Sequence, residues 1–165
     1  MEVSNVHFLD LLANNRNFFE IPVFQRNYEW GKTQCEQLFN DLEKAVRTNR
    51  DHFIGTIVYI VEAGKDSFHI SKVIDGQQRI MSLLLLLKAI ANNDSEDYDC
   101  IQESYLTNKF QKENNHLKLK PVEYDSEAFF NVMNNKKELT SSSSKVTENY
   151  RYFDQLIVRN TYSFL

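Results

Sequence analysis

The middle of the chain combines a short strand-like run with a long apolar segment. Residues 68–74 are rich in isoleucine and valine, and residues 80–87 are apolar except for Ser82. A segment that is apolar on nearly all sides suits a helix buried between other layers. The pattern therefore predicts a strand over residues 68–74 and a buried helix from about residue 77 to residue 92.

Before this segment, the pattern predicts two helices and two strands. Ser4 is expected to cap a short amphipathic helix, and Thr33 a longer one whose apolar stripe recurs at helical spacing. Pro22 places the first strand at an edge or a bend of the sheet. The expected ranges are a helix that ends near residue 14, a strand over 18–24, a helix over 33–48 and a strand over 52–61. This last strand, a turn at 63–67 and the strand at 68–74 are expected to form a hairpin.

After residue 92 the chain becomes more polar. Residues 92–99 form an acidic linker, and a helix is expected over 101–114. In residues 116–122, leucines alternate with Lys118 and Lys120, which is typical of a half-exposed strand. Asp125 or Ser126 is expected to cap a short helix over 128–133. A mobile serine-rich loop over 134–144 and a helix over 145–159 complete the prediction.

These elements predict an α+β fold with a small mixed β-sheet, packed helices and a helical extension. We expect a core over residues 1–93 and a mainly helical extension with one strand over residues 94–165, packed on that core. The 165 residues suffice for one good hydrophobic core. The final residues carry no recognisable stop signal, so we expect a fragment of a longer protein.

Composition narrows the class of protein. The net charge of −4 argues against a broadly basic nucleic-acid binder. Residues 1–10 lack the pattern of a secretory signal, and the longest apolar run is too short to span a bilayer. Cys35 and Cys100 are therefore expected to be free thiols. These features favour a cytoplasmic protein without a membrane partner.

The residues Asp75, Gly76, Gln77, Gln78 and Arg79 form the junction between the central strand and the buried helix. The first N–H groups of a helix are unpaired and its dipole favours negative charge, so such a junction suits a phosphate. Arg79 opposes the dipole, but its guanidinium group is able to hold two phosphate oxygens at once. The alternative is a salt bridge from Arg79 to Asp75 or another nearby acid.

The other residues of this junction also have two interpretations each. Asp75 is a candidate to bind Mg²⁺ or to orient an attacking water, or it simply caps the helix. Gly76 is expected to allow a backbone geometry or a close approach that a Cβ would block. The amides of Gln77 and Gln78 suit contacts with phosphate, base or water; alternatively, they are exposed polar groups of the first helical turn.

A second polar group follows the first predicted strand. Gln25 and Arg26 are expected to face the same pocket as Arg79 if the two strand ends are neighbours. The alternative for Arg26 is a surface salt bridge to Glu29. Tyr28 has an aromatic ring suited to stacking on a base, although such a ring more often anchors a loop on the core.

Three stretches of the chain occur in a familiar order, namely residues 21–30 (IPVFQRNYEW), 52–58 (HFIGTIV) and 75–79 (DGQQR). Together they resemble the N-terminal domain family of GmrSD-type, modification-dependent restriction proteins, which is similar in fold to ParB and sulfiredoxin. The resemblance continues through residues 117–130 and 148–153, so it covers most of the chain. It implies a ParB/sulfiredoxin-like core over residues 1–93.

This resemblance implies a domain that binds a nucleoside triphosphate (NTP) with Mg²⁺ and, in some members, hydrolyses it. In full-length relatives, this activity is coupled to the cutting of modified or foreign DNA by a separate C-terminal HNH-type nuclease domain. No His-Asn-His or Cys-x-x-Cys pattern occurs in this sequence, so we expect no nuclease activity from these residues. The implied catalytic residues are Asp75 and Arg79, with Asp75 also binding Mg²⁺, and the implied nucleotide-binding residues are Gln25, Arg26, Gly76, Gln77, Gln78 and Ser82.

One departure from the family pattern leaves other functions open. The helix after Arg79 usually begins with two threonines after one apolar residue, whereas this chain has Met81 and Ser82. One hydroxyl is therefore missing, and a degenerate scaffold without activity is one alternative. Another is a non-enzymatic ParB-like module that senses DNA or interacts with another partner. A homo-oligomer also stays open.

Overall fold

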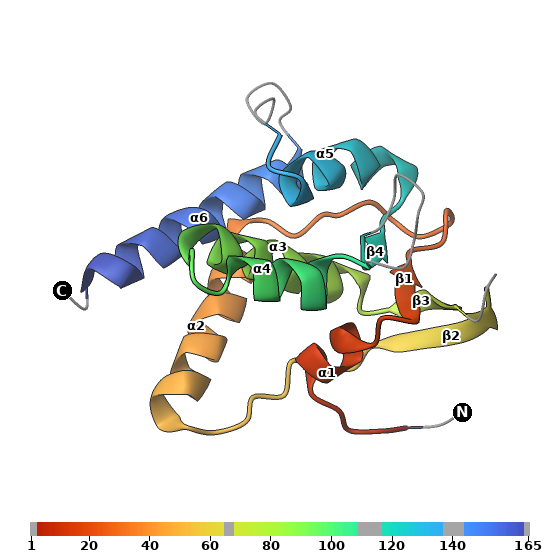
Figure 1. Cartoon of the computed structure of the whole chain (residues 1–165), viewed down its shortest axis with the longest axis horizontal. Helices are drawn as coiled ribbons and strands as arrows, with labels where there is room; N and C mark the ends of the chain where they lie inside the picture. Colours follow the sequence, from red (N-terminus) through yellow and green to blue (C-terminus); the bar gives the residue numbers. More distant parts are fainter. Residues whose placement is uncertain (1–2, 65–67, 109–116, 137–143, 164–165) are drawn as a thin grey trace.

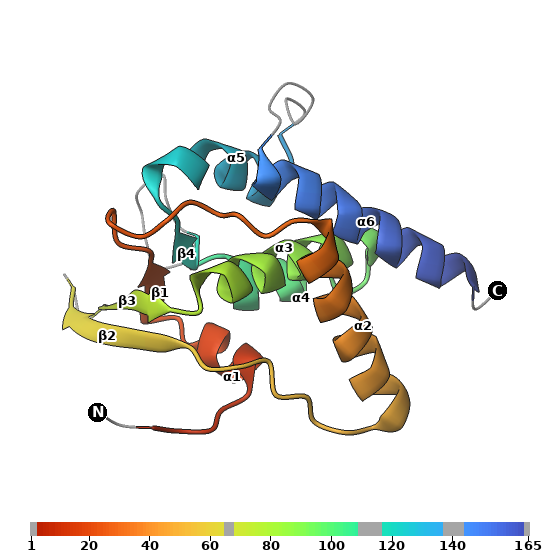
Figure 2. The same cartoon turned by 180° about the vertical axis from the view of Figure 1, so that it is seen from behind.

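The computed structural model describes residues 3–64, 68–108, 117–136 and 144–163. In this part of the chain, a small sheet lies at one end of the molecule and the helices pack together beside it (Figure 1; Figure 2). The predicted α+β class is confirmed. The elements are α1 (Phe8–Ala13), β1 (Asn17–Glu20), α2 (Lys32–Thr48), β2 (Val58–Ala63), β3 (His69–Asp75), α3 (Gln77–Asn93), α4 (Tyr98–Ile101), the π-helix η2 (Gln102–Leu106), β4 (Leu119–Lys120), α5 (Glu123–Met133) and α6 (Lys145–Ser163).

The sheet has the strand order β2-β3-β1-β4 and is mixed, as predicted. β2 and β3 form the predicted antiparallel hairpin, and β1 runs parallel to both β3 and β4. β1 has a neighbour on each side, so the edge alternative is wrong, and Pro22 instead begins a turn in which the Gln25 N–H donates to its carbonyl at 2.9 Å. The strand ends at Glu20, before Pro22, because proline lacks the N–H group that a central strand needs.

α3 is the central helix of the fold, as its apolar pattern predicts. Ile80, Leu85 and Ala89 are fully buried, and α6 packs along the helix while α4 and α5 contact it (Figure 1). The hydrophobic core around α3 includes Phe19 from β1 and Phe153 from α6. The junction that begins α3 is therefore anchored in the core. The boundary near residue 93, where α3 ends, stays a prediction.

Two helices begin at residues other than the predicted caps. α1 begins at Phe8, so the prediction that Ser4 caps it is wrong. α2 begins directly after Gly31, so Thr33 lies inside the helix and is not its cap. The side chain of Gln34 performs part of the capping, because its Oε1 accepts the Gly31 N–H at 3.0 Å. The Gln34 amide thus satisfies the N–H of the N-cap residue, whereas no side chain of the N-cap residue caps the first turn.

α5 also begins earlier than predicted. It starts at Glu123, directly after Val122, so neither Asp125 nor Ser126 is its cap. The Ser126 hydroxyl donates to the Val122 carbonyl at 3.1 Å, and the Asp125 carboxylate accepts a hydrogen bond from a distant backbone group, the N–H of Tyr28, at 2.7 Å. Tertiary contacts therefore use the side chain that the local pattern assigned to a cap.

Lys118 contradicts the prediction of a half-exposed strand. Only 1% of Lys118 is exposed, and its Nζ donates to the Asn14 carbonyl at 3.1 Å and to Asn15 Oδ1 at 3.0 Å. Its neighbour Lys120 is exposed and pairs with Glu20 at 2.9 Å. The strand β4 therefore spans only Leu119–Lys120, and the residues that follow α1 cover Lys118.

Three further ranges differ from the prediction or extend beyond the described residues. β2 begins at Val58 and not at residue 52, because the residues before it pack against the start of α3. The helix expected over 101–114 ends at Leu106, and residues 109–114 lie outside the described residues. Most of the loop expected over 134–144 and the turn residues 65–67 also lie outside them. In the described part, no helix has the length and apolar character needed to cross a membrane.

Candidate functional site

The junction between β3 and α3 leaves the first turn of the helix without a side-chain cap. Gly76 is the N-cap residue, with φ +90°, and Asp75 accepts the Gly76 N–H at 2.8 Å instead of capping the helix. The interpretation of Asp75 as a helix cap is therefore wrong. Among the described residues, no acceptor is found for the N–H groups of Gln77, Gln78 and Arg79. These groups are available to an anion at the positive end of the helix dipole.

Gly76 is required at this junction for two reasons. Its positive φ is strained for any residue that carries a Cβ. A Cβ at this position would also lie 3.0 Å from the Thr56 carbonyl oxygen and 3.2 Å from the Cα of Ile57. The segment that precedes β2 therefore lies directly against the turn, as the predicted close approach at Gly76 requires.

Arg79 contacts this same segment. Its Nη1 donates to the Thr56 carbonyl oxygen at 3.1 Å, and its guanidinium group occupies the space beside Gly55 where a Cβ would be. Among the described residues, Arg79 forms no salt bridge with Asp75 or another acid, so that alternative is wrong. Gly55 was not predicted as part of this site, although a glycine inside a strand-like run is itself a signal of close backbone approach.

Gln77 and Gln78 hold the segment between β1 and α2 against α3. Gln78 Oε1 accepts the N–H groups of Glu29 at 2.7 Å and Trp30 at 3.2 Å, and its Nε2 donates to the Asn27 carbonyl at 2.9 Å. Only 8% of Gln77 and 6% of Gln78 are exposed, so the view of these amides as exposed polar groups is wrong. Both side chains are buried connectors between two segments of the chain.

The two strand ends are neighbours, as the sequence analysis required for a shared site. Gln25 Nε2 donates to the carbonyl of Ile74, near the end of β3, at 3.1 Å. Arg26 lies beside the junction as well, because its carbonyl accepts Nε2 of Gln77 at 3.1 Å. The Arg26 guanidinium forms the alternative surface salt bridge to Glu29, at 3.4 Å, with both side chains mostly exposed.

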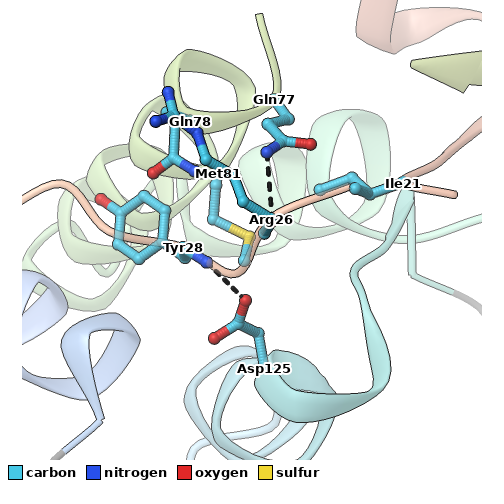
Figure 3. A pocket seen from close by; sticks show the side chains of 7 residues that line it. All are labelled: Ile21, Arg26, Tyr28, Gln77, Gln78, Met81 and Asp125. Atoms are coloured by element: carbon cyan, nitrogen blue, oxygen red, sulfur yellow. Dashed lines mark hydrogen bonds between the residues drawn. The ribbon is translucent and has the colours of Figure 1, made fainter. Parts of the chain in front are cut away.

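A narrow hollow lies between this segment, α3 and α5 (Figure 3). It leaves no space for a water molecule, so it does not enclose a small molecule. Arg79 is not part of its lining, so Arg26 and Arg79 do not share this hollow. The residues that line it are Ile21, Arg26, Tyr28, Gln77, Gln78, Met81 and Asp125.

Two hydrogen-bond acceptors line the hollow from opposite elements. Only 2% of Asp125 is exposed, and burial raises the pKa of its carboxyl group. Oε1 of Gln77 is buried without a hydrogen-bond partner among the described residues. Sequence reasoning missed Asp125 as part of this region, because nothing in the local pattern indicates that α5 packs beside Tyr28.

The Ser82 hydroxyl is buried on α3 within a hydrogen-bonded group that includes Tyr28 and Asn149. The Ser82 and Tyr28 hydroxyl oxygens are 2.6 Å apart, and Ser82 also donates to the Gln78 carbonyl at 2.9 Å. Asn149 Nδ2 donates to the Tyr28 hydroxyl at 3.0 Å. Burial raises the pKa of Tyr28. Tyr28 thus anchors its loop on the core, the alternative to base stacking that the sequence left open.

The described residues contain no group of three or more histidine, cysteine or acidic side chains that would hold a metal ion by themselves. Mg²⁺, however, is commonly bound by one or two carboxylates together with phosphate oxygens and water. Asp75 is exposed at the end of β3 and uses one oxygen for the Gly76 N–H. Its carboxylate therefore fits Mg²⁺ that arrives with a phosphate.

A comparison with known protein families gives a match over nearly the whole chain. Residues 8–164 match the family described as GmrSD restriction endonuclease, N-terminal domain. The chain belongs to this family, and the resemblance inferred from its three stretches is confirmed. It is thus a component of a restriction-type defence protein. A search of curated proteins found no match.

Proposed function

We propose that this GmrSD-type domain binds a nucleoside triphosphate with Mg²⁺ at the junction between β3 and α3, and hydrolyses it. The observation that carries the proposal is the uncapped first turn of α3, whose N–H groups at Gln77, Gln78 and Arg79 have no acceptor among the described residues. Phosphate oxygens would accept these hydrogen bonds and gain from the helix dipole. Family membership supports the same position, because the junction is one of the motifs that carry the resemblance.

Two arginines would supply the positive charge that the helix end alone lacks. Arg79 uses Nη1 for the Thr56 carbonyl and keeps further N–H donors for a phosphate. The Arg26 side chain is 66% exposed, and its ion pair with Glu29 is exposed as well. Because exposed ion pairs contribute only about 0–1 kcal/mol, Arg26 would exchange Glu29 for a phosphate at small cost.

Asp75 would hold Mg²⁺ through its carboxylate at the mouth of the junction. The metal ion would neutralise charge on the phosphates that it bridges. Gln25, whose side chain reaches the end of β3, would orient the attacking water or a phosphate oxygen. Phosphoryl transfer needs positioning and charge stabilisation more than a protein nucleophile, so these groups suffice for hydrolysis.

Gln77, Gln78 and Ser82 would contribute mainly by shaping the site. Their side chains bond within the protein, and the two amides hold the segment with Gln25 and Arg26 against α3. The implied direct contacts of these three side chains with a nucleotide stay predictions. They would require that the internal hydrogen bonds exchange for bonds to the ligand.

In the full-length protein, we expect this domain to act with a nuclease domain that cuts DNA. The residues of this chain would supply nucleotide binding and hydrolysis, and DNA would be contacted through the complete protein. The net charge of −4 fits this division, because a broad phosphate-binding surface is normally basic.

Titration calorimetry with ATP, GTP, CTP and UTP, each with Mg²⁺, tests the proposal, and release of inorganic phosphate tests hydrolysis. We expect at least one of them to bind, and Arg79→Ala to abolish that binding. Arg47→Ala is the matched control, because Arg47 lies on α2 in an exposed ion pair with Glu43. Absence of binding at millimolar concentrations, or equal binding by Arg79→Ala and wild type, would contradict the proposal.

A further inference from the structure

The contact between Gly55 and Arg79 joins two of the three stretches that carry the family resemblance. Gly55 lies in the segment before β2, with φ +96°. A Cβ built on Gly55 would lie 2.6 Å from Cζ of Arg79 and 2.8 Å from both of its terminal nitrogens. Side-chain atoms cannot approach so closely, so the guanidinium group fills the volume that any other residue at position 55 would need.

The next residue fixes the guanidinium group in a second way. The Thr56 carbonyl oxygen accepts Nη1 of Arg79 at 3.1 Å. The same oxygen lies against Gly76, where a Cβ would be 3.0 Å away. Two glycines with positive φ therefore let one segment approach both the N-cap of α3 and the arginine in its first turn. A Cβ at Gly76 would press on the backbone of this segment, whereas a Cβ at Gly55 would displace the guanidinium group.

We infer that Gly55 is a positioning residue for Arg79, so that the guanidinium group is already oriented before an anionic ligand reaches the first turn of α3. The expected effect of this positioning on ligand affinity rests on the proposed function. An exposed arginine samples many rotamers and loses that freedom when it binds. A guanidinium group held by Gly55 and Thr56 has lost most of it beforehand, and preorganisation of this kind raises affinity.

The inference assigns a role to the stretch at residues 52–58, which the proposed ligand contacts do not use. Glycine is needed there because of the volume beside it and because of its backbone angle, and the two causes are separable. The backbone strain of Gly55→Ala is the same whether or not Arg79 is present. The collision with the guanidinium group disappears when Arg79 is shortened.

A double-mutant cycle in nucleotide affinity separates the backbone strain at Gly55 from the collision with the Arg79 guanidinium group. The proteins are wild type, Gly55→Ala, Arg79→Ala and the double variant, titrated with whichever of the four Mg²⁺–NTPs wild type binds. We expect Gly55→Ala to weaken binding at least about tenfold, which corresponds to about 1.4 kcal/mol. Because Arg79→Ala is expected to abolish binding, the double variant should show none either, and the coupling between Gly55 and Arg79 is measured in the Arg79→Lys background. Gly31→Ala is the control, because a Cβ there meets only Gln34 Oε1, at 3.7 Å.

Arg79→Lys gives a second background that keeps the charge. Lysine has no planar group to occupy the space beside Gly55, so Gly55→Ala should have a smaller effect there than with Arg79. If Gly55→Ala alone does not fold, the collision predicts that Gly55→Ala with Arg79→Ala folds. Thermal unfolding of both proteins supplies that readout.

The outcomes distinguish the inference from the proposed function. If wild type binds a nucleotide and Gly55→Ala binds it equally well, the positioning role is overturned and the proposed function stands. The same holds if Gly55→Ala weakens binding as much in the Arg79→Lys background as it does with Arg79 present. If wild type binds none of the four nucleotides, both are overturned. Failure of the double variant to fold, when Gly55→Ala also fails, would assign Gly55 to backbone geometry alone and overturn the positioning role.

Discussion

The hydroxyl oxygens of Tyr28 and Ser82 lie 2.6 Å apart in the core, and this contact joins the loop after β1 to α3. Asn149 on α6 donates to the same tyrosine hydroxyl at 3.0 Å, and the Ser82 hydroxyl donates to the Gln78 carbonyl at 2.9 Å. The donors therefore run in one direction, from Asn149 through Tyr28 and Ser82 to the helix backbone. The position of the candidate site depends on this buried connection.

Tyr28→Phe should lower the free energy of unfolding by about 1–3 kcal/mol, because it removes one hydrogen-bond partner from each of the buried side chains of Asn149 and Ser82. Chemical denaturation measures the change. Tyr124→Phe is the matched control, since 76% of Tyr124 is exposed. Equal stability of the two variants would show that the connection contributes nothing measurable.

Gln78→Ala should release the loop that carries Gln25 and Arg26. The substitution removes the acceptor of the Glu29 and Trp30 N–H groups, so these amide protons should exchange with solvent markedly faster. Unfolding free energy should fall by about 1–3 kcal/mol. Hydrogen exchange followed by NMR gives the readout, with Gln37→Ala on the exposed face of α2 as control. Unchanged exchange at residues 29 and 30 would disprove the role of Gln78.

Asp125 should make stability depend on pH in the acidic range. Burial raises the pKa of its carboxyl group in the folded protein above the ordinary value of 3.8, so the folded state holds the proton more tightly. The contribution of this group to stability is therefore highest below pH 3.8 and falls as pH rises through the raised pKa. Asp125→Asn should flatten this dependence and keep an acceptor for the Tyr28 N–H.

Asp125→Ala is compared with Asp125→Asn to separate the loss of the hydrogen-bond acceptor from the loss of the titrating group. It removes the acceptor of the Tyr28 N–H, so unfolding free energy should fall by about 1–3 kcal/mol at every pH. Denaturation curves from about pH 3 to about pH 8 compare the three proteins. A wild-type profile that has the same slope as that of Asp125→Asn would contradict the assignment.

Two buried lysines should make stability depend on pH in the alkaline range. Their contribution should rise with pH, whereas that of Asp125 falls. Burial lowers the pKa of Lys88 and of Lys118 from 10.5 to about 8. Between these values the unfolded chain binds more protons than the folded protein, so stability contributed by these groups rises with pH. Lys118→Met should remove part of that rise. A difference between wild type and variant that stays constant from pH 8 to pH 10.5 would contradict this account.

Patterns along the sequence predicted the parts of the fold that depend on local periodicity. The buried helix α3 and the hairpin of β2 and β3 were predicted from runs of apolar residues, and both are present. Caps and edges were predicted less well. Asp125 and Lys118 look like surface residues in their own segments, but the loop with Tyr28 covers Asp125 and the residues after α1 cover Lys118.

In the candidate site too, features that depend on consecutive residues were predicted, and those that depend on tertiary contacts were not. The junction with Gly76 and Arg79 was predicted because strand, turn and helix are consecutive in sequence. The contact of Arg79 with Gly55 was not predicted, because it depends on how the segment before β2 folds back onto the helix. The burial of Gln77 and Gln78 was missed for the same reason: their partners lie in a distant loop, at Arg26 and Asn27.

The most direct test of the proposed site is an NMR titration of the ¹⁵N-labelled protein with the nucleoside triphosphate that binds in calorimetry, in the presence of Mg²⁺. Binding at the junction predicts that the backbone amide signals of Gln77, Gln78 and Arg79 show the largest shifts, and that Arg79→Ala abolishes them. Unchanged signals at these three residues, with shifts confined to another part of the chain, would contradict the account.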